Sequence, residues 1–168
     1  MDKNAVTLDE MLTSREERAL YQSSLINEYN CPLVSFTVVM PGAVKLNKMS
    51  EKIFLIGKEK IESALNGYNV KFKGEKNKKT GPEAYYCVDL SASVLKRLMT
   101  EVEDQCKIGR LFDIDVIGND YKPVSRTELG MPDRKCLICG GPSHACARSR
   151  KHSVDELLAE IERVLSNE

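Results

Sequence analysis

Apolar side chains recur along the chain at two spacings, which predict helices and strands in alternation. Apolar residues at helical spacing, with charged residues between them, predict helices over residues 7–28, 50–66, 93–106 and 153–165. The first of these segments is long enough for one or two helices. Runs rich in β-branched and aromatic residues predict strands over residues 33–40, 68–72, 83–90 and 111–117, with a short pairing strand near 121–126.

Helix starts and chain breaks agree with this order of elements. Thr7 with Glu10 and Ser153 with Glu156 are capping-box pairs, whose hydroxyl and carboxylate accept backbone N–H groups at a helix start. The run Lys71–Lys79 is polar and strongly basic and ends in Thr-Gly-Pro, so we expect a mobile loop there. Strands separated by helices predict an α+β or α/β fold, with one mixed β-sheet packed with helices.

Length and composition are those of an ordinary globular domain. The chain has 168 residues, of which 42% are hydrophobic. A chain of about 150 residues buries enough surface for one core, so we expect one domain over residues 1–168. No apolar run approaches the roughly 18 residues of a membrane-spanning helix. The N-terminus lacks the basic and apolar regions of a secretory signal, so we expect a cytoplasmic protein.

Charge is balanced overall but unevenly distributed. The sequence has 25 Lys and Arg against 25 Asp and Glu. This balance disfavours a general nucleic-acid-binding protein, which usually carries a clear cationic excess. Residues 122–152 hold seven basic and two acidic residues, a local net charge of +5. A cationic segment therefore lies within a neutral protein.

The segment Gly109–Val116 (GRLFDIDV) holds a candidate metal site. Because side chains alternate along a strand, Asp113 and Asp115 would emerge on one face, about 7 Å apart, while the apolar residues that alternate with them face the core. Two such carboxylates can hold Mg²⁺, which bridges phosphate oxygens, and Arg110 could clamp a phosphate beside them. The alternative is an amphipathic strand with a solvated acidic face, ion-paired to Arg110.

A cysteine-rich segment, residues 134–152, holds a second candidate metal site. Three cysteines and a histidine follow one another at spacings that suit a tetrahedral zinc site, with His144 as an alternative nitrogen ligand. The first-choice ligands are Cys136, Cys139, Cys146 and His152. Glycines and a proline between them are typical of a tight knuckle. The alternative is a set of reduced cysteines packed in a surface loop.

Basic residues are interleaved with these cysteines, among them Arg134, Arg148 and Arg150. If the knuckle folds, these cations converge on a small area that suits a ligand with several phosphates. Alternatively they form a solvated basic rim.

Four separated blocks give the chain a resemblance to a known family. They are SREER at residues 14–18, PLVSFTVVMPGAVK at 32–45, GRLFDIDV at 109–116 and RKCLIC…CARSRKH at 134–152. In this order they resemble the citrate lyase holo-acyl-carrier-protein synthases, the apo-citrate lyase phosphoribosyl-dephospho-CoA transferases, over nearly the whole chain. The resemblance implies a nucleotidyltransferase-like enzyme. Its donor would be 2′-(5-triphosphoribosyl)-3′-dephospho-CoA, its acceptor a serine of the citrate lyase acyl carrier protein subunit, and its second product pyrophosphate.

The resemblance also implies roles for particular residues. Asp113 and Asp115 become the Mg²⁺ carboxylates, one of which could accept the serine proton, with Arg110 as a further catalytic residue. The residues that fall on the family's Cys and His positions, as ligands of a structural Zn²⁺, are Cys136, Cys139, Cys146 and His152. Phosphate contacts are expected from Arg15, Arg18, Lys45, Arg134, Arg148 and Arg150. Neither nucleic acid nor a membrane is an expected partner.

Two other functions stay open at this point. A small zinc-knuckle module could grip the backbone of RNA or DNA with residues 122–151. Zero net charge and the lack of an aromatic stacking stripe favour the enzyme over this module. A related transferase could also carry out the same chemistry on the carrier subunit of another lyase or decarboxylase.

Overall fold

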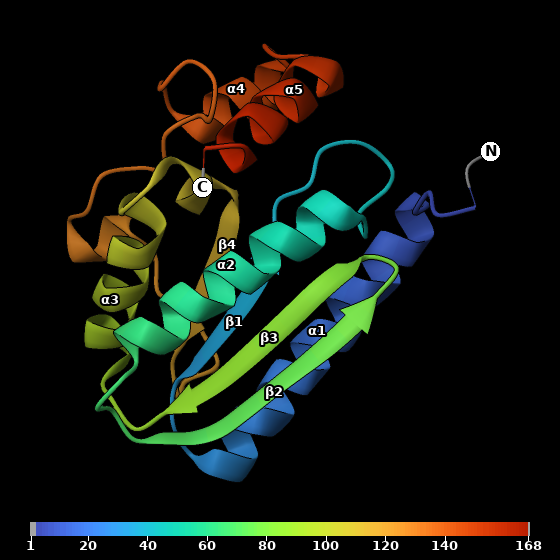
Figure 1. Cartoon of the computed structure of the whole chain (residues 1–168). Coiled ribbons are helices and arrows are strands. Elements are labelled where there is room, and N and C mark those ends of the chain that lie inside the picture. The colour runs from blue at the N-terminus through green and yellow to red at the C-terminus, as the bar shows by residue number, and fades with distance from the viewer. Residues whose placement is uncertain (1–2, 168) are drawn as a thin grey trace.

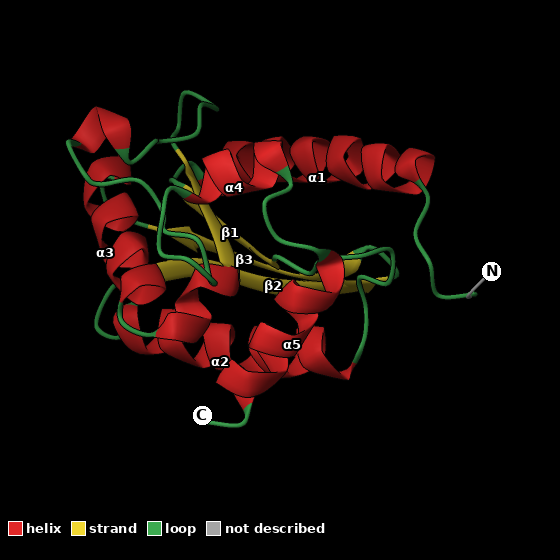
Figure 2. Cartoon of the chain, turned by 90° about the horizontal axis from the view of Figure 1, so that it is seen from above, coloured by secondary structure: helices red, strands yellow, loops and turns green. Residues whose placement is uncertain are grey.

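The computed structural model describes residues 3–167, which form one four-stranded sheet with helices on both faces (Figures 1 and 2). The strands are β1 Leu33–Val38, β2 Val70–Lys78, β3 Gly81–Val88 and β4 Phe112–Ile117. The helices are α1 Leu8–Tyr29, α2 Lys48–Ala64, α3 Ala92–Asp104, α4 Ser143–Ser149 and α5 Val154–Leu165, with short 3₁₀ turns at Lys107–Leu111 and Thr127–Leu129. Within these residues, no helix is long and apolar enough to cross a membrane.

The sheet has the strand order β2-β3-β1-β4, and its three pairings are all antiparallel. The α+β class is confirmed, and the sheet is antiparallel throughout instead of mixed. Helix α2 joins β1 to β2 and helix α3 joins β3 to β4, so each helix connects two strands that run in the same direction. In both cases another strand lies between the two. Because of this interposed strand, the hydrogen-bonded neighbours are always antiparallel.

Local signals set the helix starts. The predicted capping boxes of α1 and α5 are both present. The first helical segment forms a single helix, in which Ser14 is buried and its hydroxyl oxygen lies 2.8 Å from that of Thr80. The pairing strand expected near residues 121–126 is reduced to an isolated bridge between Ile117 and Pro123.

The basic run Lys71–Lys79, expected as a mobile loop, belongs to strand β2 apart from its last residue. β2 pairs with β3 from Val70 opposite Val88 to Lys78 opposite Gly81. Its side chains alternate between half-buried and exposed positions. Charged side chains are typical of an edge strand, because they discourage pairing with another molecule. Pairing with β3 therefore overrides the polar composition that predicted a loop.

The larger hydrophobic cluster lies between the sheet and helices α2, α3 and α5 (Figure 2). It includes Phe36, Phe54 and Phe112, whose rings contact one another through Phe36. Gly57 lets α2 approach the sheet closely, because a Cβ at this position would lie 2.3 Å from the ring of Phe36. This face of the sheet is therefore closed by packing.

Helix α1 packs on the opposite face but covers only part of it (Figure 1). Its contacts go to β1 and β3, with the rings of Tyr21 and Tyr85 edge to face at 5.0 Å between centroids. Strand β4 lies at the sheet edge farthest from β2. On the α1 side of β4, Asp113 is half-buried and Asp115 is exposed. The fold thus leaves an open strip of sheet beside α1.

Candidate active site

The acidic pair on β4 has the alternation that the sequence predicted. Phe112, Ile114 and Val116 are buried in the core, whereas the side chains of Asp113 and Asp115 emerge on the face that α1 packs against. The strand therefore presents both carboxylates on one open surface.

Strand register brings two rows of polar residues to this surface. Asp113 lies opposite Thr37 of β1, which lies opposite Glu83 of β3. The next row on the same face consists of Asp115, Ser35 and Tyr85. The Thr37 hydroxyl donates to Asp113 Oδ2 at 3.4 Å, and Ser35 accepts from the Gln22 side chain of α1 at 2.9 Å. We call these two rows of six residues the polar strip.

Glu83 is the buried carboxylate of the polar strip. Its side chain is 1% exposed, and both Nε and Nη2 of Arg18 lie 2.9 Å from its Oε1. The Tyr85 hydroxyl donates to Glu83 Oε2, and burial together with this bond raises the pKa of Tyr85. Arg18, expected to contact phosphate, is thus held by a carboxylate, with 20% of its side chain still exposed.

Arg15 and Lys45, two residues expected to contact phosphate, lie close enough to repel each other. Arg15 is exposed on α1, and Lys45 is half-buried in the loop between β1 and α2. The Lys45 ammonium donates to the Met40 carbonyl at 2.7 Å. Burial, followed by the positive charge of Arg15, lowers the pKa of Lys45. Two neighbouring cations of this kind are stabilised by an anionic ligand.

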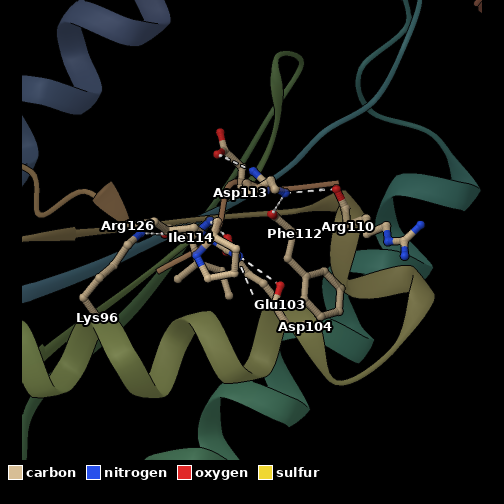
Figure 3. A network of polar contacts seen from close by, with 10 residues as sticks. Lys96, Glu103, Asp104, Arg110, Phe112, Asp113, Ile114 and Arg126 are labelled. Carbon is tan, nitrogen blue, oxygen red and sulfur yellow. Dashed lines mark hydrogen bonds and ion pairs between the residues drawn. The ribbon is translucent and has the colours of Figure 1, made fainter. Parts of the chain in front are cut away.

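Arg134 is the ion-pair partner of Asp113. Its Nη1 lies 3.5 Å from Asp113 Oδ1, and its Nη2 donates to the carbonyls of Arg110, at 2.9 Å, and Phe112. Arg110 itself donates to the Cys136 carbonyl at 3.1 Å, and its guanidinium points away from Asp113 in Figure 3. The sequence predicted Arg110 beside the acidic pair, whereas the structure places Arg134 there.

Side chains from outside the sheet cap the free edge of β4 (Figure 3). The Lys96 ammonium donates to the Ile114 carbonyl at 3.1 Å, and the Ile114 N–H donates to Glu103 Oε1 at 3.2 Å. Arg126 pairs with Glu103 Oε2 and, at 3.1 Å, with Asp104. Backbone groups on a sheet edge otherwise lack partners. These contacts therefore fix the stretch of strand that carries the acidic pair.

Sequence reasoning missed Lys96 and Glu103, although a signal for both exists. They lie two helical turns apart on α3 and are buried beside Leu95 and Val102. Charged residues are rarely buried unless they are paired. Charges that recur within the apolar face of a helix therefore point to an internal polar network.

The surroundings of the acidic pair suit a divalent cation. Desolvation by the surrounding protein raises the pKa of Asp115, and so does the negative charge of Asp113. The positive charges of Lys96 and Arg134 oppose this shift. A cation bound between two like charges relieves their repulsion. Carboxylate oxygens are also the ligands that Mg²⁺ prefers in proteins. The donor set of Asp113 and Asp115 thus fits this ion.

The four predicted zinc ligands converge in the C-terminal knuckle, residues 134–152. One ligand atom from each of Cys136, Cys139, Cys146 and His152 lies within 4.8 Å of the others, and the two sulfurs of Cys139 and Cys146 are 3.5 Å apart. In the described part of the chain, His152 Nε2 is a buried atom without a hydrogen-bond partner. Buried polar atoms normally have partners. The imidazole of His152 and the three thiols together form the donor set of a tetrahedral metal site.

A tight turn positions these ligands. The Cys136 N–H donates to the Gly141 carbonyl at 2.6 Å, and the Gly140 N–H donates to the Cys136 carbonyl at 3.2 Å. Gly140 has a φ of +70°, where a side chain would be strained. Arg148 and Arg150, expected to contact phosphate, are exposed near the end of α4. His144, the alternative ligand, is not in the group of ligands identified among residues 3–167.

Comparisons with known proteins cover nearly the whole chain. The family model described as apo-citrate lyase phosphoribosyl-dephospho-CoA transferase matches residues 6–168. A probable transferase of this name from Vibrio cholerae is 41% identical over 163 residues, which are 95% of this chain and 92% of the relative. Relatives of the same name from Citrobacter koseri and Escherichia coli are 34% and 33% identical, over 97% and 98% of this chain and 90% and 91% of theirs. The chain therefore belongs to the apo-citrate lyase phosphoribosyl-dephospho-CoA transferase family.

Proposed function

We propose that this protein transfers the 5-phosphoribosyl-dephospho-CoA group of 2′-(5-triphosphoribosyl)-3′-dephospho-CoA to a serine of the citrate lyase acyl carrier protein subunit. The reaction is of the nucleotidyltransferase type. The serine oxygen forms a bond to the α-phosphorus, the bond from that phosphorus to the leaving pyrophosphate breaks, and the serine proton passes to a base. Membership of the family supports the reaction class. The observation that carries the proposal is the open polar strip, where Asp113 and Asp115 share one face beside Arg134.

The acidic pair supplies the reacting centre in this proposal. Mg²⁺ held by Asp113 and Asp115 would neutralise charge on the phosphate oxygens. Thr37 and Arg134 hold the Asp113 carboxylate in place through its two oxygens. Asp115 is the more exposed of the two carboxylates and is open to an approaching serine, so it is our candidate for the base that accepts the serine proton.

The cations beside α1 suit the leaving group. Arg15 and Lys45 are brought together from separate elements, and a pyrophosphate would neutralise both. Arg18 is fixed by Glu83 and keeps part of its guanidinium exposed. We therefore assign the pyrophosphate to Arg15 and Lys45, with Arg18 as a preorganised third contact.

The knuckle has a structural role in this proposal. The donor set of three cysteines and His152 fits Zn²⁺, and the knuckle begins at Arg134, which pairs with Asp113. We expect one equivalent of zinc by elemental mass spectrometry of the purified protein, lost in a Cys139→Ser and Cys146→Ser double variant. Chelation should also weaken protection of the knuckle amides against hydrogen exchange. If the metal-free protein protects its knuckle amides against hydrogen exchange as well as the rest of the fold, the zinc assignment is contradicted.

Intact mass spectrometry of the carrier subunit tests the reaction. The apo carrier is incubated with the donor, Mg²⁺ and this protein, and its mass should rise by one 5-phosphoribosyl-dephospho-CoA group while pyrophosphate is released. The gain should vanish with Asp113→Asn. Glu101→Gln, the same chemical change on an exposed helix residue, serves as the control and should behave as wild type. An unchanged carrier mass with wild-type protein would contradict the proposal.

The same assay resolves the choice of acceptor. Carrier subunits of citrate lyase and of another lyase or decarboxylase are supplied together in equal amounts. We expect the citrate lyase carrier to be labelled first. Preferential labelling of the other carrier would keep the chemistry and change the acceptor.

A further inference from the structure

A pocket of about 620 Å³ lies next to the polar strip and has no role so far. Its walls come from the loop after β1, the 3₁₀ turn before β4, the knuckle and helix α5. In Figure 1 the knuckle and α5 lie at the end of the sheet where β1 finishes and β4 starts. Its volume is within the range of roughly 300–1,000 Å³ that is usual for small-molecule and cofactor sites.

The lining combines apolar side chains with cations. Apolar contact surface comes from Leu111, Leu137, Leu157 and Ile161, among others. The charged side chains in the lining are Arg110, Arg134, Lys135 and Arg150, and none of the lining residues is Asp or Glu. An apolar pocket with cations and without carboxylates suits a ligand that has both apolar and anionic parts.

Arg134 connects this pocket to the acidic pair. It lines the pocket, and its Nη1 is also 3.5 Å from Asp113 Oδ1. A ligand whose reacting phosphate lies at Asp113 can therefore extend past Arg134 into the pocket. Arg150, expected to contact phosphate, lies in this lining as well, whereas Arg148 does not.

We propose that this pocket binds the dephospho-CoA portion of the donor. The inference rests on the proposed function and assigns a binding site to the part of the donor that does not react. Dephospho-CoA has an adenine ring and a pantetheine arm, which bury apolar surface, and a diphosphate, which needs cations. The apolar lining contacts the adenine ring and the pantetheine arm, and the guanidinium and ammonium groups bind the diphosphate.

Isothermal titration of the zinc-loaded full chain with dephospho-CoA itself tests this site. Ala147 is an exposed α4 residue in the pocket lining, so Ala147→Trp fills the pocket without replacing a core residue. We expect binding by wild type and at least about tenfold weaker binding by Ala147→Trp and by Arg150→Glu. Lys151→Glu makes the same charge change on a neighbouring exposed residue outside the lining, and it should bind nearly as wild type.

The outcomes separate the pocket from the reaction. Absence of binding by wild type, or equal binding by wild type and both pocket variants, overturns the pocket assignment even if the carrier is labelled. Equal weakening by Arg150→Glu and Lys151→Glu, with no effect of Ala147→Trp, also overturns it, because general charge then explains the result. Weakened binding in the pocket variants without any labelling of the carrier supports the pocket and contradicts the proposed function.

Discussion

Glu83 and Asp113 lie in one row of the sheet, on either side of Thr37, yet their surroundings differ. Glu83 is 1% exposed and is held by Arg18 and Tyr85 under helix α1. Asp113 belongs to the strand that α1 leaves open, and 47% of its side chain is exposed beside Arg134. The protein itself satisfies the first carboxylate, whereas the second is available to a ligand. Coverage by α1 is therefore the difference between a carboxylate enclosed by partners within the protein and one that is accessible to a ligand.

The largest expected effect is on the open side of this comparison. Asp115→Asn should lower the rate of carrier labelling about a thousandfold, because a group that acts at the reacting phosphate is lost. The free energy of unfolding should change by less than about 0.5 kcal/mol, as for other exposed positions. Labelling kinetics and urea unfolding of the same preparation check both parts. A fully active variant would contradict the role of the acidic pair.

On the covered side, the main expected effect is on stability. Glu83→Gln leaves the mostly buried Arg18 without a carboxylate, so we expect a loss of about 2–3 kcal/mol in the free energy of unfolding, measured in urea. Glu101→Gln on exposed α3 surface is the matched control. If Glu83→Gln unfolds like wild type but loses labelling activity, then Glu83 belongs with the chemical residues and the comparison breaks down.

The cap on the β4 edge should give an intermediate effect. Glu103→Gln removes the charge that pairs with Arg126 and weakens the acceptor of the Ile114 N–H. We expect a loss of about 1–2 kcal/mol in stability and roughly tenfold lower kcat, because the strand that carries the acidic pair loosens. Hydrogen exchange at the Ile114 amide should quicken. Slow exchange there with lowered kcat would show that Glu103 acts by another route.

The smallest effect is expected at the opposite edge of the sheet. Lys73 of β2 forms an ion pair with Glu62, in which 48% of the Lys73 side chain and 37% of the Glu62 side chain are exposed. Exposed pairs contribute little to stability. Lys73→Ala should therefore leave the urea midpoint and the labelling rate unchanged. A clear loss of either would give the basic run Lys71–Lys79 a role beyond pairing with β3.

Much of the fold could be predicted from local patterns. The helices α1, α2, α3 and α5, the strands β1, β3 and β4 and the outward face of Asp113 and Asp115 follow from periodicity and capping signals, whereas the short helix α4 in the knuckle was not predicted. Strand β2 could not be predicted in full, because its polar residues become a strand only through pairing with β3. The antiparallel pairing could not be predicted for a similar reason. Strand β3 lies between β1 and β2 in the sheet, and β1 lies between β3 and β4, but neither has this position in the sequence.

The site was predictable only where its residues are neighbours in sequence. The ligand set of the knuckle lies within one short segment, and the structure brings it together. The partner of Asp113 is Arg134 and not Arg110, which is closer in sequence, because the start of the cysteine-rich segment lies against the start of β4. Contacts of this kind depend on how distant segments pack, and local sequence does not determine them.

The interposed strand β1 has a consequence for synthesis of the protein. β1 pairs with β3 on one side and with β4 on the other, and Leu33 lies opposite Ile117. A nascent chain that has not yet released β4 from the ribosome therefore carries β1 with one unpaired edge of alternating, largely apolar residues. Such an edge can pair with another molecule. Pairing of β4 closes this edge, and the same step places Asp113 and Asp115 on the sheet beside β1.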